Sequence, residues 1–426
     1  MEKTLYRDSA ETVYRQVLPN GLPVCVVHRP GFTKKLAYFV TDFGSISTRF
    51  RLNGRDIVSP DGIAHFLEHK MFDLPGRDVS AEFAALGASP NAFTSYDMTA
   101  YYFSCSEHFE ENLKLLLEFV STPYFTEESV RKELGIINQE IGMSLDSPDN
   151  RIFEMLAQAM YVNHPIAVSI LGTKQSIAAI TPQDLTDCHN AFYRPGNMVL
   201  CVIGDVSPES VCQIASSVLP QTDTVTVSRP EVWDEPMTPR VSYVSEKMDV
   251  AMPMFQLGFK CAPTGKGENA IRQEIIGDLA AEALLGQSSA LYMKLYEQGL
   301  IDGSFGGGFE AISGMAMFTC GGDSTDPEKV KDAILAQAQA LSDRGLEPGE
   351  FDRLRRSALG RRIRDLDSFD STCFRVCACQ FEKYDYFRFP EIYRSIRESD
   401  IIDFIRTAVT PDNCCLSVIY PTKQEA

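Results

Sequence analysis

Residues 61–72 have the sequence DGIAHFLEHKMF, which contains the pattern His65-x-x-Glu68-His69. On a helix, positions i, i+3 and i+4 share one face, so both imidazoles can reach one metal ion and the carboxylate can reach a water beside it. The order is the reverse of the common H-E-x-x-H zinc motif, and the chemistry requires only the shared face. Two surface histidines on an ordinary helix are the alternative. The pattern favours a metal site with Glu68 as the general base.

A zinc site of this kind needs a third protein ligand and an open position for water. A second predicted helix, residues 126–145, carries Glu133 and Glu140, which are nearly two turns apart and therefore face the same way. They could supply one ligand and one carboxylate that orients a ligand or handles protons. A solvated acidic face is the alternative, because Glu127 and Glu128 are also on this helix.

The composition excludes several classes of protein. The chain has 426 residues, of which 44% are hydrophobic and 23% charged, as in ordinary globular proteins. Forty Lys+Arg against 58 Asp+Glu give a net charge of −18, which argues against binding to nucleic-acid phosphates. No segment approaches the roughly 20 apolar residues of a membrane-spanning helix, and the N-terminus has no apolar signal core. We therefore expect a cytoplasmic protein that binds neither membrane nor nucleic acid, with its twelve cysteines reduced.

The length suits two domains of roughly 200 residues each. A proline-rich stretch with few apolar residues predicts a linker at residues 221–240, which leaves an N-terminal domain, 1–220, and a C-terminal domain, 241–426. Two strand-like runs flank Asn20-Gly21, a strong hairpin signal. Strands and helices are interspersed, so the predicted fold is α+β, with a mainly antiparallel sheet flanked by helices in each domain.

The second half of the chain repeats the order of elements in the first half. The segment GLEPGEFDRL resembles the earlier YFTEESVRKEL when the two are offset by 221 residues, which predicts an internal duplication. With this offset Arg361 stands opposite Glu140, and Leu354 stands opposite Glu133. The second domain is therefore predicted to lack a metal site.

Three further segments carry predictions. Ser59-Pro60-Asp61 predicts a helix start, and residues 91–105, rich in Tyr, Phe and Thr, predict a strand. Asn91 could equally be a turn residue before that strand. A predicted helix near residue 360 carries six arginines, which we expect to pair locally with acidic side chains: Arg353, Arg355, Arg356, Arg361, Arg362 and Arg364.

These motifs resemble the pitrilysin/insulysin and mitochondrial-processing-peptidase family of zinc peptidases, the inverzincins. The likeness rests on LPNGL at 18–22, DGIAHFLEHKMF at 61–72, NAFTSYDMTAYYF at 91–103 and ELGIINQEI at 133–141. It is greatest for single-chain bacterial members of similar length, and among them for the zinc-bearing half of a paired system.

The resemblance implies a zinc metalloendopeptidase with one Zn²⁺ per chain. His65, His69 and Glu140 correspond to the family's metal ligands. Glu68 corresponds to its catalytic base, and Glu133 to a second catalytic carboxylate two turns before the third ligand.

The resemblance also implies how a peptide substrate is held. Asn91, Ala92, Phe93 and Thr94 correspond to an edge strand to which the peptide adds itself through backbone hydrogen bonds. Two such chains would close like a clamshell around a peptide chamber. The expected partner is a homologous chain without the zinc motif, in a heterodimer, or a second copy of this chain.

One segment departs from the family pattern. In GQSSALYMKLYEQGLIDGSF, residues 286–305, the positions of the family's carbonyl-binding Arg and Tyr hold Tyr296 and Asp302 after one deletion. Neither side chain can supply positive charge to a developing oxyanion. The pair is therefore expected from a homologous chain or from elsewhere in this one.

Two other functions are compatible with parts of this sequence. A non-catalytic core or assembly subunit of the same fold would need none of the four metal-site residues. A lyase that cleaves S-ribosylhomocysteine shares H-x-x-E-H, but it is a single short domain with a cysteine as its third ligand.

Overall fold

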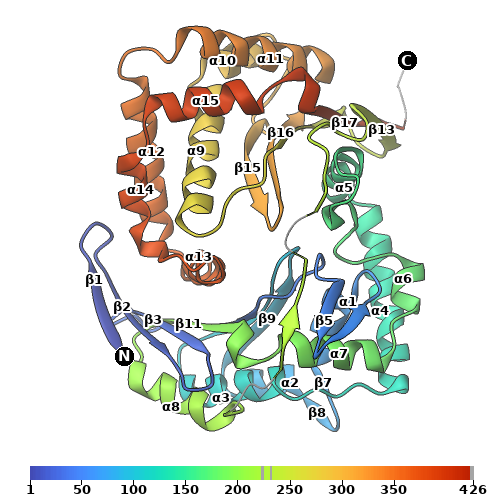
Figure 1. Ribbon diagram of the computed structural model, residues 1–426, viewed down its shortest axis with the longest axis vertical. Coiled ribbons are helices and arrows are strands. Elements are labelled where there is room, and N and C mark those ends of the chain that lie inside the picture. The colour runs from blue at the N-terminus through green and yellow to red at the C-terminus, as the bar shows by residue number, and fades with distance from the viewer. Residues whose placement is uncertain (222–224, 231–232, 423–426) are drawn as a thin grey trace. The chain divides into compact units, whose positions relative to one another are not determined.

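The computed structural model describes residues 1–221, 225–230 and 233–422 (Figure 1). Contacts within the chain divide it into two compact units, and each unit takes a segment from the opposite half of the sequence. Unit 1 comprises Met1–Ile141, Ser169–Pro230 and Ile363–Arg388, and unit 2 comprises Gly142–Val168, Glu231–Arg362 and Phe389–Ala426. The predicted linker, 221–240, includes residues 222–224 and 231–232, which lie outside the described residues. The predicted domain bounds therefore stay a prediction.

Unit 1 is built on a seven-stranded sheet in the order β1-β2-β3-β11-β4-β10-β9. Its strands are β1 (Glu2–Tyr6), β2 (Glu11–Val17), β3 (Pro23–His28), β4 (Lys35–Thr41), β9 (Ala88–Thr94), β10 (Thr99–Cys105) and β11 (Met198–Gly204). The strands β5 (Arg49–Leu52), β6 (Arg55–Val58) and β12 (Val227–Ser228) form a small second sheet, and β7 (Asp73–Leu74) pairs with β8 (Arg77–Asp78).

Helices cover both faces of the large sheet of unit 1. One face packs against α3 (Phe109–Val120), and α13 (Phe369–Phe381) lies on the other face against β11 and β4 (Figure 1). The remaining helices of this unit are α1 (Ile63–Met71), α2 (Val79–Ala85), α4 (Glu127–Leu145), α6 (Lys174–Ala178), α7 (Pro182–Phe192) and α8 (Pro208–Val218). The last turn of α4 belongs to unit 2.

The hairpin predicted at Asn20-Gly21 is confirmed. Strands β2 and β3 pair antiparallel on either side of it. Gly21 has a φ of 88°, a conformation that costs glycine little, and the Asn20 side chain accepts a hydrogen bond from the amide of Leu22.

One expectation for local structure is wrong. Residues 91–105 form two antiparallel strands, β9 and β10, because SYDM between them makes a turn in which the Ser95 amide donates to the Met98 carbonyl. The helix predicted after Ser59-Pro60-Asp61 is present as α1, which starts at Ile63, with Gly62 just before it and no side-chain cap.

Unit 2 repeats the topology of unit 1. Its sheet order is β13-β17-β14-β16-β15. The edge pair β13 and β17 is parallel, and every other pair is antiparallel. In unit 1 the five strands β3-β11-β4-β10-β9 show the same pairing directions and the same chain order. Two α+β halves with one topology are the arrangement that a duplicated sequence predicts, so the predicted fold class is confirmed.

Unit 2 consists of the five strands of this sheet and the helices around it. Its strands are β13 (Tyr243–Met248), β14 (Met254–Cys261), β15 (Gly306–Ile312), β16 (Met315–Asp323) and β17 (Cys414–Pro421). Its helices are α5 (Pro148–Met160), α9 (Glu268–Leu285), α10 (Ala290–Glu297), α11 (Pro327–Arg344), α12 (Glu350–Asp365), α14 (Phe389–Ser395) and α15 (Glu398–Ala408). The last turn of α12 belongs to unit 1.

The arginines on α12 pair locally, as expected, at the positions for which contacts are described. Arg361 lies 2.7 Å from Glu282, Arg355 lies 2.9 Å from Asp352, and Arg353 contacts Glu350. In the described ranges, no helix is long and apolar enough to cross a membrane.

Candidate metal centre

Helix α1 carries the HFLEH segment and is a core helix. Eight of its nine residues are buried, and His69 is the exception. The helix begins behind Gly62, whose φ is 88° and where a Cβ would lie 2.5 Å from the carbonyl oxygen of Leu171. Only glycine fits this position, so Gly62 fixes where the helix starts and hence which residues face the site.

The structure brings His65 and His69 of α1 together with Glu140 of α4. The two imidazole centroids are 4.7 Å apart. Nε2 of His65 lies 3.4 Å from Oε1 of Glu140, and Nε2 of His69 lies 3.4 Å from Oε2. Among the described residues, this is the one group of three His, Cys, Asp or Glu side chains whose donor atoms all lie within 4.8 Å of one another.

The geometry of these donors fits zinc. A tetrahedral ion with bonds of about 2.0–2.1 Å holds its ligand atoms roughly 3.4 Å apart. Each histidine Nε2 lies at this distance from a different oxygen of Glu140, and one donor atom from each residue lies within 4.8 Å of the others, so the cluster is close to the size that one ion requires. Two imidazoles and one carboxylate also match the ligand set of catalytic zinc sites, which leave one position open. The Glu140 side chain is 41% exposed, so this side of the cluster is open to solvent. Hydrogen bonding to His65 lowers the pKa of Glu140, which keeps this carboxylate ionised as a ligand must be.

Glu133, two turns earlier on α4, lies behind His69. Its Oε1 atom is 3.0 Å from Nδ1 of His69, the ring nitrogen that faces away from Glu140. A carboxylate in this place accepts the Nδ1 proton and fixes the tautomer that leaves Nε2 free to bind a metal. This contact favours an orienting role over direct proton transfer to substrate, and the catalytic role given to Glu133 stays a prediction.

Replacing Glu133 with Gln should weaken metal binding without abolishing it. An amide holds His69 less firmly than a carboxylate does, and loss of such an outer partner typically costs 10- to 100-fold in metal affinity. The measurement is a zinc competition titration against a chelator of known affinity. Glu128→Gln, an exposed position on the same helix, is the control and should bind zinc as the wild type does. Unchanged affinity in Glu133→Gln would remove the orienting role.

Glu68 lies beside the cluster on the same face of α1. The residue is only 9% exposed, and its Oε2 atom accepts a hydrogen bond of 2.6 Å from the Thr94 hydroxyl. Burial raises the pKa of Glu68, while the bond from Thr94 and the nearby histidines oppose the rise. A buried carboxylate with a raised pKa is a stronger base than one in water, which suits it to take a proton from a water molecule.

The four residues predicted to bind substrate lie on β9, at the free edge of the large sheet. The amide of Ala92 donates to the side chain of Asn91. Phe93 contacts Phe374 of α13, on one face of the sheet, and Thr94 contacts α1 on the other face. Asn91 therefore lies within the edge strand and not in a turn before it, but its binding role stays a prediction.

The hydrogen bond from Thr94 to Glu68 was not predicted from the sequence. These residues are 26 positions apart, and no local pattern indicates that the last residue of a strand contacts the sixth residue of a helix. His164 and His189, which lie outside the motif, have backbone partners, as expected. His164 contacts the carbonyl of Ser313, and His189 contacts the carbonyl of Val120.

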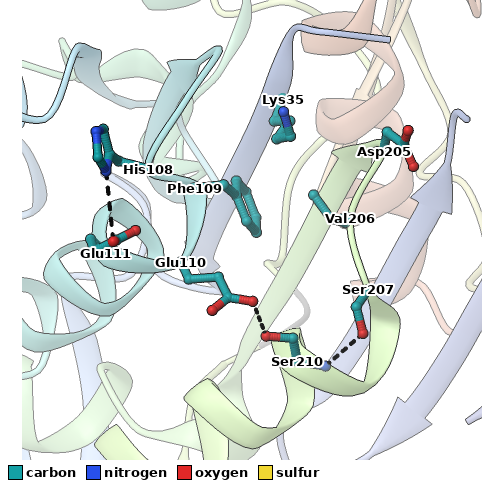
Figure 2. Close-up of a pocket in the computed structure, with 9 residues that line it drawn as sticks. All are labelled: Lys35, His108, Phe109, Glu110, Glu111, Asp205, Val206, Ser207 and Ser210. Atoms are coloured by element: carbon teal, nitrogen blue, oxygen red, sulfur yellow. Dashed lines mark hydrogen bonds and ion pairs between the residues drawn. The ribbon is translucent and has the colours of Figure 1, made fainter. Parts of the chain in front are cut away.

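A separate surface pocket of about 370 Å³ lies between the first turns of α3 and α8 (Figure 2). Lys35, His108 and Asp205 are among its lining residues, and none of the candidate metal-site residues lines it. Its acidic side chains are engaged locally, since Glu111 faces His108 and Glu110 accepts from Ser210 (Figure 2). This pocket is therefore distinct from the metal centre.

Comparisons with known proteins agree with this fold. Residues 57–174 match the model of the insulinase family, peptidase family M16, and residues 179–358 match the model of the peptidase M16 inactive domain. The uncharacterized zinc protease YmfH of Bacillus subtilis is 36% identical over 98% of both chains. The chain therefore belongs to the M16 peptidase family, and the resemblance noted in the sequence is confirmed.

Two further relatives extend the comparison. The crystal structure of an M16-like peptidase from Alicyclobacillus acidocaldarius superimposes with a TM-score of 0.92 at 32% identity, and covers 97% of this chain and 99% of its own. The beta subunit of the mitochondrial-processing peptidase of Caenorhabditis elegans is 29% identical over 46% of this chain and 42% of its own.

Proposed function

We propose that this protein is a zinc-dependent endopeptidase that cleaves peptides or unfolded segments. The observation that carries the proposal is the cluster of His65, His69 and Glu140, with the buried base Glu68 on the same helix face. Membership of a peptidase family and a full-length relative named a zinc protease support it. A purely structural subunit needs neither the three donor atoms at zinc-like spacing nor a buried carboxylate beside them.

The chemistry divides between the ion and the side chains. A zinc ion held by His65, His69 and Glu140 would act as a Lewis acid that polarises a peptide carbonyl and lowers the pKa of a nearby water. Glu68 takes the proton from that water and delivers it to the leaving amine nitrogen. Glu133 holds His69 in orientation through Nδ1.

The edge strand β9 is the proposed place for the substrate. Among the described residues, no strand pairs with its outer side, so an extended peptide can add to it by backbone hydrogen bonds. Its last residue, Thr94, contacts Glu68. A peptide paired there runs beside the base.

Zinc removal provides the test of the proposed function. The chelated protein should lose cleavage of an unstructured peptide and regain it when one equivalent of zinc is added. A compact, protease-stable protein should resist digestion, whereas its reduced and unfolded form is cut, since an extended edge-strand substrate must be unfolded. Absence of bound zinc, together with no cleavage after zinc addition in the presence of all co-purifying chains, would favour the non-catalytic subunit.

We also infer that the active form is a pair of chains, in which a homologous chain without the zinc motif supplies the group that binds the substrate carbonyl. Tyr296 is stacked on Tyr292, and Asp302 accepts hydrogen bonds from Ser304. Neither offers a cationic donor for a developing oxyanion. A relative named as one subunit of a processing peptidase supports the pairing.

The pure zinc-loaded chain should therefore be a poor peptidase. Adding the homologous chain from the same cell should raise turnover on the order of 10²-fold or more, the typical effect of one oxyanion donor. The measurement is the turnover number on a fluorogenic peptide at fixed zinc, with and without that chain. Full activity in a strictly homomeric preparation would reject the heteromeric pairing and place the donor within this sequence.

A further inference from the structure

The contact between Thr94 and Glu68 has a defined direction. Thr94 Oγ1 lies 2.6 Å from Glu68 Oε2 and 3.4 Å from Oγ1 of Thr99. The hydroxyl of Thr99 is itself 2.8 Å from the carbonyl oxygen of Phe43, which can only accept. The Thr99 proton is therefore committed to Phe43, and the single Thr94 proton is free for the nearer carboxylate.

The strand geometry places this hydroxyl where the other proposed substrate-binding residues cannot reach. Successive side chains of a strand point to opposite faces of a sheet. Ala92 packs into the core of unit 1, and Thr94, two positions on, shares its face. Phe93 points to the opposite face, where it contacts Phe374. Of the four residues from Asn91 to Thr94, only Thr94 has a described side-chain hydrogen bond to Glu68.

We propose that Thr94 is a positioning residue for Glu68. Its hydroxyl holds Oε2 by a short hydrogen bond and leaves Oε1 as the oxygen that exchanges protons with water and leaving group. This assignment rests on the proposed peptidase function. It gives Thr94 two tasks, because its backbone belongs to the peptide-binding edge and its side chain fixes the base.

The proton balance follows from this geometry. Oε1 of Glu68 accepts a proton as the water oxygen forms its bond to the peptide carbon. The same proton then passes from Oε1 to the amine nitrogen as the carbon–nitrogen bond breaks. The Thr94 proton stays on its own oxygen throughout, so Thr94 is neither acid nor base.

The same contact ties the substrate strand to the chemistry. Glu68 is on α1 and Thr94 ends β9, so the bond sets the register between the two elements. A peptide paired with β9 is thereby held in a fixed position relative to the Glu68 carboxylate, which is the geometric requirement for efficient attack of water on the peptide carbon.

The kinetic test compares two substitutions at position 94. Thr94→Val keeps the shape and removes the hydroxyl, and we expect kcat to fall about 10- to 100-fold, as for loss of one hydrogen bond to a charged group, with KM nearly unchanged. Thr94→Ser keeps the hydroxyl and should retain most of the wild-type kcat. The control is Thr41→Val. Thr41 ends β4 of the same sheet, and its buried hydroxyl donates to the carbonyl of Phe192, so its loss should leave the wild-type kcat unchanged. Zinc content and the unfolding temperature of every variant are measured alongside.

A crystallographic test decides the proposal independently of activity. The Glu68 carboxylate should occupy one orientation in the wild type and in Thr94→Ser, and should rotate away or become disordered in Thr94→Val. If the zinc-loaded wild-type protein shows no peptidase activity in the presence of all co-purifying chains, the proposed function fails, and the orientation of Glu68 still decides its positioning by Thr94. Unchanged Glu68 orientation together with unchanged kcat in Thr94→Val would overturn the proposal.

Discussion

Glu68→Gln is expected to bind zinc as the wild type does and to lose peptide cleavage by about 10²- to 10⁴-fold, the usual contribution of a positioned general base. The substitution keeps the size of the side chain and its ability to accept a hydrogen bond from Thr94. It removes only the capacity to take a proton. The fall should appear in kcat, with KM and the unfolding temperature close to those of the wild type.

The matched control for this substitution is Glu82→Gln. Glu82 is a partly exposed glutamate on α2 that pairs with Arg77, and its replacement should leave turnover unchanged. Near-wild-type turnover in Glu68→Gln, measured with the same substrate and zinc content, would show that another group acts as the base.

Substitution of the proposed ligands should affect the metal itself. Glu140→Gln and His65→Ala each remove one of the three donor atoms. Zinc affinity should fall by more than the roughly 10- to 100-fold expected for Glu133→Gln, because that change removes only an outer partner. Equilibrium dialysis followed by elemental analysis gives the stoichiometry, which should fall well below one zinc per chain at concentrations that saturate the wild type.

Glu128→Gln again serves as the control, since it changes the same residue type on the same helix at an exposed position. It should retain one zinc per chain. Full occupancy in Glu140→Gln would place the third ligand elsewhere, and Glu133, at 3.0 Å from His69, would be the first residue to examine.

The local part of the site could be predicted from the sequence, because helical periodicity alone determines it. The spacing of His65, Glu68 and His69 puts three side chains on one face of a helix, and the spacing of Glu133 and Glu140 does the same on the next. The contact between these two helix faces depends on the tertiary structure. The family resemblance indicated it, and in the structure each histidine Nε2 lies 3.4 Å from an oxygen of Glu140.

Other features could not be predicted, because they depend on contacts between distant segments. Gly62 begins α1 because the carbonyl of Leu171 leaves no room for a Cβ, and residue 171 is far along the chain. The predicted linker at residues 221–240 could not indicate that Ile363–Arg388 belongs with unit 1, since that segment is recognised only through its packing on β4 and β11. The turn that separates β9 from β10 contains no glycine or proline, the usual signals of a break.

The position of the metal tests the central claim most directly. Crystals of the wild-type chain grown with zinc can be measured at the zinc absorption edge, where anomalous scattering locates the ion without reference to activity. We predict one strong peak per chain, bonded to Nε2 of His65, Nε2 of His69 and the carboxylate of Glu140. A peak held by other residues, or no peak at full zinc loading, would contradict the proposed metal centre.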